Sequence, residues 1–148
     1  VAIRYPRGGD DIYQQSQWNP NATVIAHCHG KDAAIVTYGR LVNNAVAAAD
    51  ILAEQGVHIS VIRLSCLAPI DFSGIKTVLN GIENIIIAEE TSAGIHDCVA
   101  FAIGAHHRVS CVDLGCEYVT HGSVSQLYEK YGLDAPALAA KVKEVLGK

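Results

Sequence analysis

The sequence predicts an α/β domain of three layers, with helices on both faces of a mostly parallel sheet of about five strands and one antiparallel edge strand. Runs with strand character alternate with runs of helical period along most of the chain. One run, Ile85 to Ala88, is apolar and β-branched enough to be buried on both faces, as in a central parallel strand. Half of the 148 residues are hydrophobic and 18% are charged, which suffices for a sizeable core in a single domain.

The first part of the chain predicts a connector followed by a β-hairpin. Residues 8–22 are polar and contain Gly-Gly and Asn-Pro, which is typical of a connecting segment. Two β-like runs, 23–28 and 33–38, flank the turn signal His29-Gly30-Lys31-Asp32. We therefore expect a hairpin, with the first strand at the antiparallel edge of the sheet.

Helical and strand patterns then alternate to the end of the chain. Gly56 should end the first helix, Asp71 should cap the second, Ser123 and Gln126 form a capping box, and Asp134 should cap the last helix. The predicted helices are 40–55, 69–79, 94–107, 123–132 and 134–146. The predicted strands between them are 57–64, with polar and apolar residues in imperfect alternation, 85–88 and 109–114.

Composition excludes several classes of protein. No apolar run approaches the roughly 18 residues of a membrane span, and a net charge of −4 argues against a general nucleic-acid binder. The five cysteines are odd in number and form no C-x-x-C pair, which favours free thiols in a reducing compartment. With no signal segment, we expect a cytoplasmic protein. The chain has no Met and opens Val1-Ala2-Ile3, as if cut from a longer protein.

The local clusters of reactive residues do not complete an active site. His27 and His29 should share one face of a strand and Cys28 the other, so neither a Cys–His pair nor a zinc site is expected, and a Cys28 thiol hydrolase is a minor alternative. His106-His107 should lie at a helix C-terminus, where imidazolium is favoured. No catalytic residue and no metal-ligand set is predicted.

Two acidic residues and two arginines are the better candidates. Glu89 and Glu90 should point to opposite faces, with one carboxylate accepting amides of the helix that begins near Gly94. Arg4 and Arg7 lie in the stiff segment Arg-Tyr-Pro-Arg-Gly, and two guanidinium groups there suit either a phosphate or an inter-domain salt bridge.

The order of motifs resembles the C-terminal third of the thiamine-diphosphate-dependent transketolase family, closest to its 1-deoxy-D-xylulose-5-phosphate synthase branch. The resemblance covers essentially the whole chain. The motifs that carry it are Ala2-Ile3-Arg4-Tyr5-Pro6-Arg7-Gly8, Ile35-Val36-Thr37-Tyr38-Gly39, Val61-Ile62-Arg63-Leu64 with Leu67 and Pro69-Ile70-Asp71, Ile87-Ala88-Glu89-Glu90, His121-Gly122-Ser123 and Tyr131-Gly132-Leu133-Asp134.

The resemblance implies how this chain would serve a larger enzyme. Residues 1–22 would end a preceding pyrimidine-binding domain and form a linker, and residues 23–148 would be the C-terminal domain. Thiamine diphosphate and magnesium would be bound by domains absent here. Arg7, supported by Arg4, would bind substrate phosphate. His121 and Glu90 would lie near the active site or at an interface.

The implied partners are the preceding domains, a second subunit in a homodimer, and small sugar phosphates, with neither nucleic acid nor membrane. The parent would transfer a two-carbon unit to an aldose phosphate, and this fragment alone would be inactive. Two alternatives stay open: the C-terminal domain of a 2-oxoacid dehydrogenase E1 β subunit, and the C-terminal part of a split transketolase. Where the family commonly has Gly-Gly before a helix, this chain has Ala93-Gly94.

Overall fold

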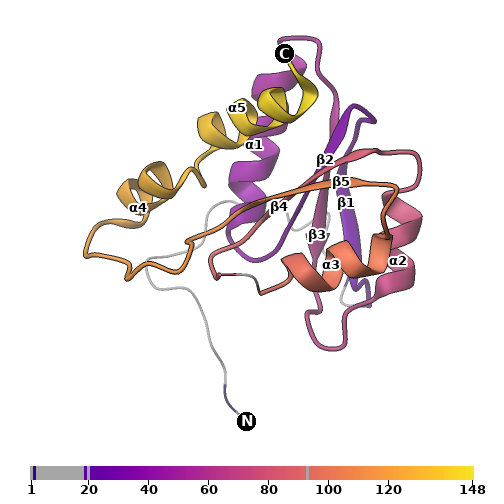
Figure 1. Ribbon diagram of the computed structural model, residues 1–148, viewed down its shortest axis with the longest axis horizontal. Coiled ribbons are helices and arrows are strands. Elements are labelled where there is room, and N and C mark those ends of the chain that lie inside the picture. The colour runs from indigo at the N-terminus through magenta and orange to yellow at the C-terminus, as the bar shows by residue number, and fades with distance from the viewer. Residues whose placement is uncertain (1, 3–18, 20, 93) are drawn as a thin grey trace.

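A computed structural model describes residues 2, 19, 21–92 and 94–148 (Figure 1). Its five strands form one sheet in the order β1-β3-β2-β4-β5, with β1 antiparallel to its neighbour and the other pairs parallel. The strands are β1 (Val24–His29), β2 (Ala33–Thr37), β3 (Ile59–Leu64), β4 (Asn84–Ala88) and β5 (Arg108–Val112). The helices are α1 (Leu41–Ala53), α2 (Phe72–Val78), α3 (His96–Ile103), α4 (Val124–Tyr131) and α5 (Ala135–Leu146).

The predicted hairpin between β1 and β2 is wrong, because β3 lies between these two strands. The turn after β1 passes over the start of β3: the Gly30 amide donates to the Ile59 carbonyl (3.1 Å), and Asp32 accepts the His58 amide (2.7 Å). A side chain at Gly30 would meet the His58 backbone at 2.0 Å, so only glycine allows this crossing. Every residue of β2 is buried, which suits a central strand, whereas β1 is only half-buried and suits the edge.

Helices cover both faces of the sheet, as the three-layer prediction requires (Figure 1). One hydrophobic core joins a face of the sheet to α1 and α5 through residues such as Leu41, Leu52, Leu138 and Val142. The second core joins the other face to α2 and α3 through Ile75 and Val99. The sheet is therefore buried on both sides. Its central strand β4, predicted to be such a strand, has four of its five residues buried.

Helix α4 lies beyond these layers, at the end of the molecule to the left in Figure 1. None of its residues is buried, although Tyr128 and Tyr131 pack against the rim of the first core. The segment 113–123 that leads into α4 is also largely exposed. No helix in the described part of the chain is long and apolar enough to span a bilayer.

The local signals placed most helix ends within three residues, and α3 differs most from its prediction. Asp71 caps α2 by accepting the Gly74 amide, the Ser123–Gln126 capping box opens α4, and Asp134 caps α5. Helix α3 ends at Ile103 because Gly104 adopts a φ of 80°.

The expectation for His106 and His107 fails because of this early end. His106 and His107 follow α3 instead of ending it, and the His107 imidazole contacts the Ile82 carbonyl (Nδ1···O 2.8 Å). The strand predicted at 57–64 is confirmed as β3, and five of its six residues are buried.

Candidate functional site

The chemistry-bearing residues that the fold brings together lie at the carboxyl edge of the sheet. From β2 the chain moves to β3 on one side and then to β4 on the other, so the strand order reverses between β2 and β4. In open α/β sheets, ligands collect outside the carboxyl ends of strands near such a point. Glu89 and Glu90 directly follow β4, and Asp113 directly follows β5.

Glu89 is wholly buried, and its carboxylate accepts three hydrogen bonds at the start of α3. The donors are the Ile95 amide (2.9 Å), the His96 amide (3.2 Å) and the Thr91 hydroxyl (2.8 Å). A Cβ at Gly94 would lie 2.4 Å from Thr91 Oγ1 and 2.6 Å from Glu89 Oε2, so a larger residue would displace this hydrogen-bonded pair. The prediction that one of the two glutamates accepts amides of this helix is confirmed.

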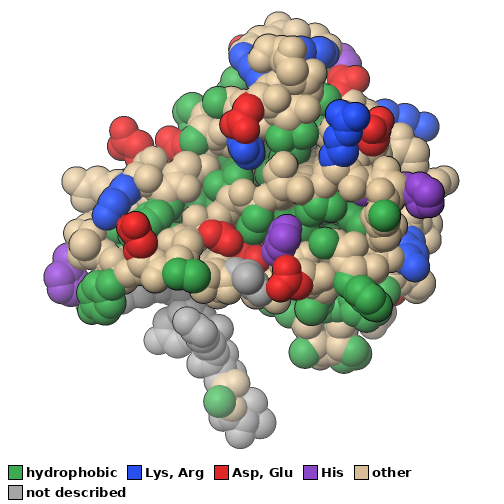
Figure 2. All heavy atoms as spheres, viewed as in Figure 1, with side chains coloured by type: hydrophobic (Ala, Val, Ile, Leu, Met, Phe, Trp, Pro, Cys, Tyr) green, Lys and Arg blue, Asp and Glu red, His purple; other side chains and the backbone are tan. Residues whose placement is uncertain are grey.

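Glu90 lies at a different place, on the wall of a shallow apolar groove. The Tyr128 hydroxyl of α4 donates a hydrogen bond to the exposed Glu90 carboxylate. The groove has a volume of about 230 Å³ and is lined by Glu90, Leu114, Val119, Val124, Leu127 and Tyr128. His121 is exposed on the segment that borders this groove. Figure 2 shows apolar, acidic and basic side chains side by side on the surface at this end of the molecule.

Cys111 and Asp113 join Glu89 in a cluster that the sequence pattern does not reveal. One donor atom from each of these three side chains lies within 4.8 Å of the other two. The Cys111 thiol donates to the Asp113 carboxylate (Sγ···Oδ2 3.4 Å). Burial, the hydrogen bond to Asp113 and nearby carboxylate charges raise the pKa of Cys111 to about 12. The sequence does place Glu89 after one predicted strand and Asp113 near the end of another. It does not show that these two strands, β4 and β5, are neighbours in the sheet.

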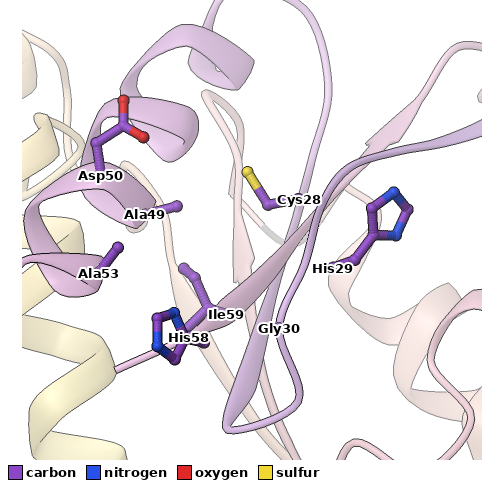
Figure 3. A pocket seen from close by; sticks show the side chains of 8 residues that line it. All are labelled: Cys28, His29, Gly30, Ala49, Asp50, Ala53, His58 and Ile59. Atoms are coloured by element: carbon purple, nitrogen blue, oxygen red, sulfur yellow. The ribbon is translucent and has the colours of Figure 1, made fainter. Parts of the chain in front are cut away.

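Cys28 lines a separate hollow of about 260 Å³ near the opposite edge of the sheet (Figure 3). Its thiol points toward the side of Ala49 and Asp50, whereas the His29 ring points the other way. A bulge in β1 between Ala26 and Cys28 interrupts the regular pairing with β3. Burial, and then the Asp50 charge, raise the pKa of the Cys28 thiol, which disfavours the thiolate a nucleophile would need.

The two arginines predicted to bind phosphate, Arg4 and Arg7, lie outside the described residues. Their proposed role thus rests on the sequence. The structure does not bring Glu89 and Glu90 together as an acid–base pair, because one is buried against α3 and the other faces α4.

Comparisons with known proteins agree on one family. A family model described as "Transketolase, C-terminal domain" matches residues 22–138. The chain is 33% identical to a 1-deoxy-D-xylulose-5-phosphate synthase of Clostridium kluyveri (99% of this chain, 24% of that protein). It is 32% identical to the protein of the same name from Chlorobaculum tepidum (97% of this chain, 24% of that protein).

A solved structure shares the fold. It is described as "Split gene transketolase, inactive beta4 tetramer", and superposes with a TM-score of 0.75 at 28% identity, covering 95% of this chain and 47% of that one. The chain thus spans about a quarter of the length of the curated relatives above and about half of this structural relative.

Proposed function

The chain belongs to the transketolase C-terminal domain family, and on that premise we propose that it serves a thiamine-diphosphate-dependent enzyme of the 1-deoxy-D-xylulose-5-phosphate synthase type. The observation that carries this proposal is the 33% identity to such a synthase over 99% of the chain. The parent enzyme would transfer a two-carbon unit from a keto donor to an aldose phosphate in the cytoplasm.

The cofactor would be held elsewhere in the parent. Thiamine diphosphate, with magnesium, supplies the stabilised carbanion in two-carbon transfer. The Gly-Asp-Gly motif that holds the diphosphate and metal in this family does not occur in the sequence. The buried Glu89 accepts amides of α3 and is therefore unsuited to act on an aminopyrimidine ring. We therefore propose that the described residues of this chain do not hold the cofactor.

The direct contribution of this chain to the reaction would come from Arg7, supported by Arg4. From the sequence we expect Pro6 to favour an extended backbone at Tyr5, which would hold both arginines at a fixed spacing. A planar guanidinium binds phosphate through two parallel hydrogen bonds, which orients the acceptor sugar as well as holding it.

A test of this role compares phosphorylated and unphosphorylated aldose acceptors in the full-length enzyme. We expect Arg7→Ala to lower kcat/KM for the phosphorylated acceptor by about 10- to 150-fold, since a hydrogen bond to a charged group contributes roughly 1.5–3 kcal/mol. The unphosphorylated acceptor should lose little. Arg108→Ala is the matched control, because Arg108 pairs with Glu83 at the opposite end of β5. Equal losses for both acceptors would contradict phosphate recognition.

The remaining role would be assembly. One end of the molecule is largely exposed. No residue of α4 is fully buried there, its first residue Val124 is 39% exposed, and Tyr118 in the preceding segment is 89% exposed. We propose that this end, with Glu90 and His121, contacts the preceding domain and contributes to a homodimer. Large exposed apolar groups on a folded domain mark an interaction surface.

A split transketolase is the second candidate, favoured by the fold shared with a split-gene enzyme. The two candidates differ in the coding sequence upstream of Val1. A synthase would carry the Gly-Asp-Gly element in the same open reading frame, whereas a split enzyme would carry it on a separate chain.

A further inference from the structure

We propose that Glu89, Cys111 and Asp113 form a binding site for one divalent transition-metal ion of the zinc class. The sequence predicts no metal site here, because the donors come from separate strands and follow no recognised spacing. The fold places their donor atoms within 4.8 Å of one another. This inference stands apart from the proposed transferase function.

Two paired strands, β4 and β5, position the three donors. Strand β4 leads into Glu89 and strand β5 contains Cys111, and the two strands pair in parallel as far as Ala88 and Val112. The Glu89 amide extends this ladder by donating to the Val112 carbonyl (3.0 Å). Donors on paired strands keep their spacing, which is the preorganisation a metal site needs.

Each donor keeps capacity for a metal bond. A carboxylate offers about four lone-pair positions, and Glu89 uses three of them in the hydrogen bonds of α3. Asp113 accepts from the Gly115 amide (2.7 Å) and from the Cys111 thiol. The three donors to Glu89 fix the orientation of its carboxylate, as outer hydrogen bonds do around metal sites.

The donor set selects the class of ion. A thiolate with two carboxylates suits zinc, cobalt or cadmium, whereas magnesium and calcium prefer oxygen ligands alone. Ligand atoms around tetrahedral zinc lie roughly 3.3–3.7 Å apart, given bonds of about 2.0–2.3 Å. The donor atoms lie within 4.8 Å of one another, so rotations of the half-buried Cys111 and Asp113 side chains would bring them to this spacing, with water as the fourth ligand.

Binding exchanges one proton for one metal ion. The Cys111 sulfur loses its hydrogen, now directed at Asp113, to solvent and forms a bond to the metal. The Asp113 carboxylate, which no longer accepts the thiol hydrogen, then binds the metal. No group is oxidised or reduced. The expected stoichiometry is one metal bound and one proton released per chain.

Titration of the reduced 148-residue chain with cobalt(II) chloride tests the site. We expect one equivalent to bind, with a thiolate-to-cobalt charge-transfer band that zinc chloride abolishes and with proton release into a weakly buffered solution. Cys111→Ser should remove the band, and Asp113→Asn should weaken cobalt binding at least ~10-fold. Cys28→Ser and Cys98→Ser are matched controls that should keep the band.

Alkylation provides a measurement that needs no variant, should Cys111→Ser fail to fold. Cys111 is half-buried and its raised pKa makes its alkylation slow, so the alkylation rate is followed over hours with excess reagent. Zinc chloride should lower that rate further in the unaltered chain, while the exposed Cys98 and Cys116 keep their rates. Absence of a charge-transfer band at excess cobalt, a band that survives Cys111→Ser, or zinc protection confined to another cysteine would each overturn the proposal.

Discussion

Helices α4 and α5 have equally good capping residues at both ends, and yet they differ in how they pack against the core. Each begins with a side chain that accepts an amide of its first turn, Ser123 or Asp134, and each ends at a glycine with a left-handed backbone, Gly132 or Gly147. Helix α5 buries Leu138, Ala139 and Val142 against α1 and the sheet, whereas no residue of α4 is fully buried. Capping residues thus determine where a helix begins and ends, but burial decides whether it belongs to the core.

The largest expected difference comes from truncating one leucine in each helix. Leu138→Ala in α5 should lower the free energy of unfolding by about 2–5 kcal/mol, because Leu138 is fully buried and leaves a cavity. Leu127→Ala in α4 should lower it by less than about 1 kcal/mol, because Leu127 only lines an open groove. Urea unfolding of both variants checks this. Equal losses would show that α4 is part of the core.

The N-caps should differ in the same direction by a smaller amount. Asp134→Ala should cost about 1 kcal/mol of global stability, since α5 unfolds with the core. Ser123→Ala removes the capping box of α4 and should cost less than about 0.5 kcal/mol globally, because α4 can fray without exposing the core. Circular dichroism during urea unfolding gives both values. A Ser123→Ala loss as large as that of Asp134→Ala would contradict the comparison.

The last comparison of α4 and α5 needs no substitution, because it measures amide hydrogen exchange in the unaltered chain. Amides in the interior of α5 should exchange only with global unfolding, while those of α4 should exchange at least ~10-fold faster through local opening. Repeating the measurement on the full-length enzyme sharpens the comparison. If α4 contacts the preceding domain as proposed, its amides become protected there; unchanged exchange of α4 would argue against that contact.

Much of the fold followed from the sequence, and the failures have a common cause. The Asp71, Ser123 and Asp134 caps were predictable because a cap joins residues three positions apart. The pairing of β1 with β3 was not predictable from the turn after His29, because that turn also suits a crossing over the start of β3. A close approach between Gly30 and His58 involves residues far apart in the chain, and no local pattern reports it.

In the candidate sites too, contacts between residues near in the sequence could be predicted and contacts between distant residues could not. The role of one glutamate at the start of α3 could be predicted, since strand alternation separates Glu89 from Glu90 and the amides of α3 lie a few residues downstream. The partner of Glu90, Tyr128, lies 38 residues away in α4 and became visible only in the structure. His106 and His107 were misplaced because Gly104 ended α3 earlier than the apolar period suggested.

The sequence by itself determined the α/β class, the family, the helix caps and the central place of Ile85 to Ala88, because each depends on neighbours in the chain or on the period of apolar residues. Only the tertiary structure decided that β3 separates β1 from β2, that α4 reaches only the rim of a core, and that Glu89, Cys111 and Asp113 meet. These features depend on which strands become neighbours. That choice minimises exposed apolar surface over the whole sheet, so no single segment encodes it.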